Sequence, residues 1–134
     1  MGSGVAAFSA SSCAVDVDGG LRLACQETIG ALEGTFVTTI EGLSKDRSHP
    51  VQQALLATNI VQCGFCIPGV VMAASVLLRN NRNPSEGDIK EAIPNICRCG
   101  IYPRLIGAIT DAARLARGDA PLANGPEPET PAPE

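Results

Sequence analysis

Four of the six cysteines stand in two short clusters, and this spacing constrains the fold more than any other feature of the sequence. Cys63 and Cys66 form a C-x2-C pair within "QCGFCIPG", and Cys97 and Cys99 form a C-x-C pair within "CRCG". In a reducing compartment, such pairs are more often metal ligands or redox groups than structural disulfides. The sequence therefore predicts a metal–thiolate site built from two separate loops.

Several kinds of site are compatible with four cysteines. The simplest is four buried thiols that act as small hydrophobic groups. A structural zinc site is a second alternative, although zinc knuckles usually present two C-x2-C pairs on turns. A thioredoxin-like dithiol needs only one C-x-x-C pair in a βαβ setting. A 2Fe–2S cluster held by four thiolates best accommodates the short C-x-C pair.

Composition narrows the class of protein. The net charge of −4 and a pI near 4.9 argue against a nucleic-acid-binding protein. No apolar run approaches the ~20 residues that span a bilayer, so no membrane insertion is expected. Aromatic residues make up only 3% of the 134 residues, so the core must be built from small aliphatic side chains. A bound cofactor or partner would add stability to such a core.

The segment "CAVDVDGGLRLAC" predicts a β-hairpin, because alternating apolar residues flank the turn signal "DGG". Folding about Gly19 would place Cys13 opposite Cys25 on an apolar face, and Asp16 opposite Arg22 on a solvent-exposed face. Asp16 is therefore expected to be a surface group. A further strand is expected in "TFVTTI" at 35–40.

From His49 onward the apolar residues follow a helical period. His49 is expected to cap a helix that begins at Pro50, Ser85 and Asp88 resemble a capping box, and Gly118 can end the last helix. Four helices are expected, at 49–62, 68–78, 86–93 and about 103–117. Both cysteine pairs would then lie where the chain approaches a helix N-terminus, whose partial positive charge stabilises thiolates.

These elements predict an α+β fold in three parts. Residues 1–47 are expected to form a β-rich fragment, short of a full sheet, with a linker. Residues 48–118 are expected to form a four-helix bundle that binds the 2Fe–2S cluster. The tail at 119–134 is rich in proline and acidic residues and carries no base, so it is expected to be disordered.

The segment from "VQCGFCIPG" through "NPSEGDIKEAIPNICRCGIYPRLIGAI" resembles the small iron–sulfur subunit of the molybdenum hydroxylases, the xanthine oxidase and aldehyde oxidoreductase family. The isoquinoline-oxidoreductase type looks nearest, and the resemblance runs from about 13 to 117. It implies that residues 1–47 are a partial ferredoxin-like (β-grasp) fragment with a linker. It implies an electron-transfer subunit whose partner large subunit binds molybdopterin and oxidises an aldehyde or N-heterocycle. A flavin or cytochrome c electron acceptor is a further expected partner.

The resemblance also implies roles for particular residues. The two cysteine pairs would ligate the 2Fe–2S cluster nearer the molybdopterin. Gln62 would face the pterin, and Gly64 and Gly100 would let backbone N–H groups approach the cluster sulfurs. The four implied ligands are Cys63, Cys66, Cys97 and Cys99.

The sequence departs from the family pattern in two places. The loop before the C-x-C pair is one residue shorter than usual and carries Pro94. Cys13 and Cys25 match the last two ligands of a second, plant-ferredoxin-like cluster, but its first two ligand positions fall on Val5 and Ala10. We therefore expect no second cluster. Cys13 and Cys25 would be either plain apolar-face residues or thiols that oxidise to each other.

Two other functional hypotheses remain open from the sequence. The chain could be a truncated structural or non-functional remnant of the family, or a structural module that binds zinc. The first residues carry no positive charge before a weakly apolar stretch, so no secretory signal is expected. The default location is therefore the cytoplasm, with the periplasm as the alternative if a partner is exported together with this chain.

Overall fold

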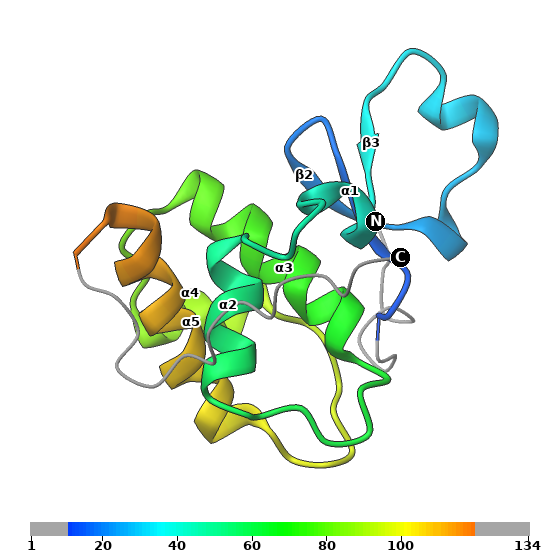
Figure 1. Ribbon diagram of the computed structural model, residues 1–134. Coiled ribbons are helices and arrows are strands. Elements are labelled where there is room, and N and C mark those ends of the chain that lie inside the picture. Colours follow the sequence, from blue (N-terminus) through cyan, green and yellow to red (C-terminus); the bar gives the residue numbers. More distant parts are fainter. Residues whose placement is uncertain (1–10, 120–134) are drawn as a thin grey trace, which may run out of the picture.

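A computed structural model describes residues 11–119. As Figure 1 shows, the first part of the described chain forms a small sheet and the later part forms a group of helices. The predicted tail beyond Asp119 and the positions Val5 and Ala10 lie outside the described residues. The elements are β1 (Ala14–Val17), β2 (Gly20–Leu23), β3 (Val37–Thr38), α1 (Ile40–Leu43), α2 (Pro50–Ala57), α3 (Ile67–Asn80), α4 (Glu86–Ala92) and α5 (Tyr102–Arg117).

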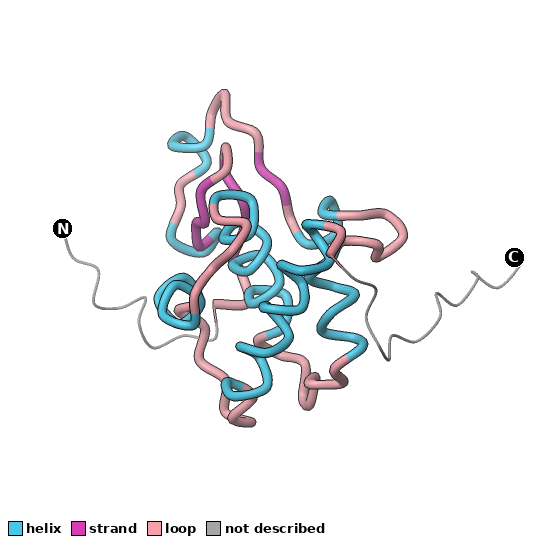
Figure 2. Tube along the Cα trace, turned by 90° about the vertical axis from the view of Figure 1, so that its left-hand side faces the viewer, coloured by secondary structure: helices cyan, strands magenta, loops and turns pink. Residues whose placement is uncertain are grey.

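The central element is α3, which is buried on nearly every side. The sheet packs against α3, and α2, α4 and α5 also contact it, so one helix joins the β and α parts. In Figures 1 and 2 the strands gather at one end of the molecule. The mixed α+β class predicted from the sequence is confirmed, whereas the division at 47/48 stays a prediction.

The β-hairpin forms, but its predicted register is wrong. Asp18 and Gly19 both adopt positive φ, 51° and 88°, so they form a two-residue turn. Val15 therefore pairs with Arg22, and Asp16 pairs with Leu21. The strand order is β2-β1-β3, and β3 is much shorter than the strand predicted at 35–40.

Asp16 is buried, which contradicts the prediction of a surface group. Its side chain is only 4% exposed, and it forms an ion pair with Arg79 of α3. The second carboxylate oxygen accepts the Gly19 N–H at 2.8 Å. A buried carboxylate needs such partners because desolvation of a lone charge is costly. The ion pair therefore fixes the hairpin against α3.

The predicted caps at three helix ends are confirmed, whereas α2 ends at Ala57 and not at the predicted position 62. Ser85 and Asp88 form a capping box at the start of α4, and Gly118 ends α5 with a left-handed φ of 79°. The Val51 N–H donates to Nδ1 of His49 at 3.3 Å, so His49 caps α2. Within 11–119, no helix is long and apolar enough to cross a membrane.

The cap at His49 predicts a pH dependence of folding. His49 lines a surface pocket together with Arg79 and Arg82. Burial, with a smaller contribution from the charge of Arg79, lowers the pKa of His49. Because the folded-state pKa lies below the unfolded value of about 6.5, the neutral form is favoured in the folded protein. This contribution to stability is present above about pH 6.5 and is lost as the pH falls through the folded-state pKa.

Urea unfolding of the full chain between about pH 5 and pH 8 measures this effect. His49→Asn keeps a cap acceptor but does not titrate in this range. The variant should therefore lose less stability on acidification than the wild-type chain. Equal losses in the two proteins would show that His49 does not carry the effect.

Candidate metal centre

The four clustered cysteines line one small cavity between the start of α3 and the loop before α5. Cys66 is the most buried of the four, at 4% exposed, and Cys63 is exposed. The structure thus brings together residues that are more than thirty positions apart in the sequence. The cavity is lined by Gln62, Cys63, Gly64, Cys66, Ile67, Cys97, Cys99 and Ile101.

The first cysteine pair is held by a turn that leads directly into α3. Gly64 has a φ of 81°, which favours glycine, and its carbonyl accepts the Ile67 N–H at 3.3 Å. Cys66 is the N-cap residue of α3, and Pro68 follows within its first turn. The prediction that this pair lies at a helix N-terminus is confirmed. Gln62 is exposed at the rim of the cavity.

The second cysteine pair lies on a turn that precedes α5. Gly100 has a φ of 71°, and its N–H donates to the Cys97 carbonyl at 3.3 Å. An L-residue at Gly64 or Gly100 would be strained by the backbone conformation. Both glycines predicted as site residues thus occupy positions that the turns require.

The thiols stand as two pairs, and each pair takes one cysteine from each loop. The free thiols of Cys66 and Cys97 are hydrogen-bonded to each other, as are those of Cys63 and Cys99. Burial, together with the bond to Cys97, raises the pKa of Cys66 to about 11. Burial alone would raise the pKa of Cys97, but hydrogen bonds from the Ile101 backbone N–H, the Cys66 thiol and further backbone N–H groups together lower it. Ionising all four thiols together would be costly without a compensating cation.

The donor set fits a two-iron cluster. All four donors are sulfur, and they form two pairs, so each of two irons could take one thiolate from each loop. Among residues 11–119, no group of three or more His, Cys, Asp or Glu side chains is placed to hold a single metal ion. Gly64 and Gly100, one in each cysteine turn, both adopt positive φ.

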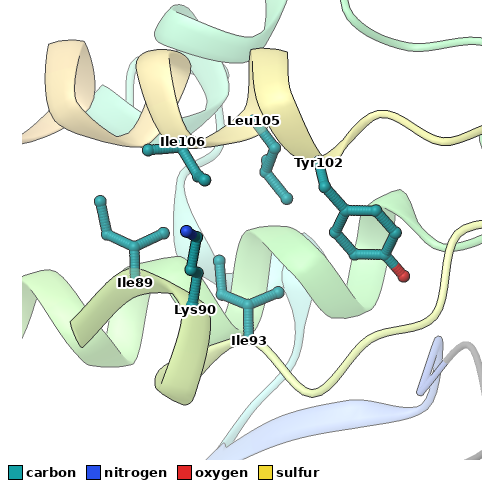
Figure 3. Close-up of a pocket in the computed structure, with 6 residues that line it drawn as sticks. All are labelled: Ile89, Lys90, Ile93, Tyr102, Leu105 and Ile106. Atoms are coloured by element: carbon teal, nitrogen blue, oxygen red, sulfur yellow. The ribbon is translucent and has the colours of Figure 1, made fainter. Parts of the chain in front are cut away.

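Tyr102 positions the second loop, and this role was not predicted from the sequence. Its hydroxyl accepts the Cys97 N–H at 2.6 Å and donates to the Asn95 carbonyl at 2.9 Å. The Tyr102 ring lines an apolar groove between α4 and α5, and Figure 3 shows its hydroxyl pointing away from that groove. The other lining residues are Ile89, Lys90, Ile93, Leu105 and Ile106.

The segment before β1 supports both cysteine loops. The Ser12 hydroxyl donates to the carbonyl of Phe65, which lies between Cys63 and Cys66. Asn95 is buried and its Nδ2 lies 3.4 Å from the Ser11 carbonyl oxygen. No motif in the sequence marks these contacts, because they join segments that are far apart in the chain.

Removal of the Tyr102 hydroxyl should loosen the second loop. Tyr102→Phe leaves the Cys97 N–H and the Asn95 carbonyl without this partner, at a cost of about 1–2 kcal/mol of unfolding free energy. Urea unfolding measures the cost, and iron release to a chelator should become several-fold faster. Thr110→Val, which also removes a hydroxyl from α5, should stay within about 0.5 kcal/mol of wild type. Equal behaviour of the two variants would contradict the role of Tyr102.

Comparison with known proteins decides the family. A family model described as a 2Fe-2S binding domain matches residues 39–110, more than half of the chain. The chain belongs to this family. The matched range includes both cysteine pairs and most of the helices.

Related proteins confirm the resemblance to the iron–sulfur subunits of the molybdenum hydroxylases. The alpha subunit of isoquinoline 1-oxidoreductase from Brevundimonas diminuta is 40% identical over 106 residues, covering 78% of this chain and 70% of the relative. One of the subunits of nicotinate dehydrogenase from Pseudomonas putida is 38% identical over 108 residues, covering 79% and 69%.

Solved structures agree with the fold of this 2Fe–2S binding domain protein. The aldehyde oxidoreductase of Desulfovibrio desulfuricans superposes with a TM-score of 0.78 at 36% identity, over 85% of this chain and 13% of that one. Quinoline 2-oxidoreductase of Pseudomonas putida 86 superposes with a TM-score of 0.73 at 31% identity, over 90% and 76%. The chain thus corresponds to a small part of the aldehyde oxidoreductase.

Proposed function

We propose that this chain is an electron-transfer subunit that holds one 2Fe–2S cluster and receives electrons from the molybdopterin centre of a partner large subunit. The observation that carries the proposal is the cavity lined by two cysteine pairs from two loops. Cys63, Cys66, Cys97 and Cys99 would be the ligands. A bound 2Fe–2S cluster supplies one-electron exchange at a potential set by its surroundings.

The chain's own residues would hold and shield this site. Burial of Cys66 limits water at the inner side of the cavity, and the backbone N–H groups of Cys99, Gly100 and Ile101 lie near the Cys97 sulfur. The Tyr102 hydroxyl would keep the Cys97 loop in place. We propose that Gln62, at the exposed rim of the cavity, faces a pterin in the partner.

The rim around the cysteines has the character of a docking surface. Phe65 is 72% exposed, and Val61, Ile96 and Tyr102 are each 40% exposed. Exposed apolar groups that surround a site are typical of surfaces that bind another protein. We propose that this rim contacts the large subunit, since an electron donor must approach the cluster closely.

The names of the relatives suggest the substrate class of the complex. They include oxidoreductases of isoquinoline, quinoline, nicotinate and aldehydes. We propose that the large subunit oxidises an aldehyde or an N-heterocycle, and that a flavin or cytochrome c partner accepts the electrons. This chain would not contact the substrate.

Metal analysis of the full chain, purified anaerobically, tests the proposal. Two irons and two acid-labile sulfides per chain, with one spin-half EPR signal after dithionite reduction, are expected. Zinc in place of iron would favour the structural zinc module. Absence of any metal after reconstitution with iron and sulfide would favour the non-functional remnant. More than two irons per chain would contradict the expectation of a single cluster.

A further inference from the structure

A second thiol pair lies outside the four-cysteine cavity, at the open end of the β-hairpin. Cys13 precedes β1, and Cys25 lies in the short 3-10 turn that follows β2. Their Sγ atoms are 3.3 Å apart. The Ala24 N–H donates to the Cys13 carbonyl at 3.0 Å, so the backbone holds the two ends of the hairpin together.

Both sulfurs are available to a small reagent and are unequal in acidity. Cys25 is exposed and Cys13 is partly exposed. Hydrogen bonding from the Cys25 backbone N–H lowers the pKa of Cys13, and the bond to Cys13 raises the pKa of Cys25. A thiol with a lowered pKa beside a second thiol has the arrangement of an attacking and a resolving cysteine.

We propose that Cys13 and Cys25 are a redox-active dithiol that exchanges with low-molecular-weight disulfides such as oxidised glutathione. The Cys13 thiolate attacks one sulfur of the small disulfide, forming a mixed disulfide and releasing one small thiolate. Cys25 gives its proton to solvent and attacks Cys13 Sγ, releasing the second small thiolate. The dithiol is oxidised by two electrons, and one small disulfide is reduced to two thiols.

Little movement is needed for this reaction. A disulfide has an S–S distance of about 2.0 Å, so the two sulfurs must approach by a little over 1 Å. β2 is an edge strand and the turn at 24–26 holds no buried residue, so both can shift without disturbing the core. The geometry of the dithiol therefore suits a disulfide that forms and is reduced again reversibly.

The site is separate from the proposed cluster. Neither Cys13 nor Cys25 lines the four-cysteine cavity. The inference stands whether or not iron binds there, and its test does not depend on electron-transfer activity.

Peptide mapping of the full chain can detect this disulfide directly. Trypsin cleaves after Arg22, which lies between the two cysteines, so only a disulfide can join the resulting peptides 1–22 and 23–45. Anaerobically purified protein would be equilibrated with reduced and oxidised glutathione at a series of ratios, quenched with acid, alkylated and digested. The linked peptide pair should rise with the share of oxidised glutathione and disappear after dithiothreitol.

Single-cysteine variants supply the controls. Cys25→Ser should stop at the mixed disulfide of Cys13 with glutathione, and Cys13→Ser should give no linked pair. Iron content and visible absorption should not change between the reduced and oxidised samples. The inference is overturned if both thiols stay fully alkylated at every ratio, or if either one links to a different cysteine. It is equally overturned if bound metal protects both thiols from alkylation.

Discussion

Replacing Cys66 by serine is expected to abolish the metal centre. Cys66 is the most buried of the four clustered cysteines and belongs to the Cys66–Cys97 pair. A serine hydroxyl is a much weaker iron ligand than a thiolate. Iron and acid-labile sulfide per chain should fall at least about tenfold, with loss of the EPR signal of the reduced protein.

Cys25→Ser provides the matched control for this experiment. It removes one thiol from the same chain, but from the hairpin and not from the four-cysteine cavity. Its iron content should equal that of the wild-type chain. If Cys66→Ser kept full iron content, or if Cys25→Ser lost it, the assignment of the ligands would be wrong. Far-UV circular dichroism of both variants would show that the helices remain formed.

Replacing Gly69 by alanine is expected to have the largest effect on stability. A Cβ atom at Gly69 would lie 2.0 Å from the Ser11 carbonyl oxygen and 2.6 Å from Asn95 Nδ2. The nearest atom belongs to the backbone and cannot rotate away, so the segment before β1 would be displaced from α3. We expect a loss of at least about 3 kcal/mol in the free energy of unfolding, at the upper end of overpacking costs.

The same substitution in α5 provides the control for Gly69→Ala. Gly107 is an exposed helical residue, and a Cβ there would meet no atom within 4 Å. Gly107→Ala should leave stability unchanged or raise it by about 0.5–1 kcal/mol, because alanine favours the helix. Urea unfolding of both variants measures the contrast. A small effect at Gly69 would show that the contact with Ser11 does not restrain the chain.

Local signals in the sequence predicted the four longer helices, but not α1, and the gathering of the cysteines. The caps at His49, Ser85 and Gly118 depend on residues close in the chain, so the sequence could reveal them. The turn residues around the cysteine pairs are similarly local, since Gly64 and Gly100 must adopt positive φ.

Features that depend on distant residues could not be predicted in the same way. The predicted hairpin register assumed a turn centred on Gly19 alone, which "DGG" permits. The observed register follows from a two-residue turn at Asp18 and Gly19. Asp16 is buried because Arg79, 63 positions away, supplies its counter-charge. The role of Tyr102 depends on the path of the loop that holds Asn95.

The contact between Ser11 and Asn95 has a consequence for how the protein is made. These residues are separated by 84 positions, so the segment that braces both cysteine loops emerges from the ribosome long before its partner. Closing so long a stretch of chain is slow compared with forming the local helices. The segment before β1 must therefore wait for the loop that holds Asn95 before it can dock, and metal loading must follow synthesis of both cysteine pairs.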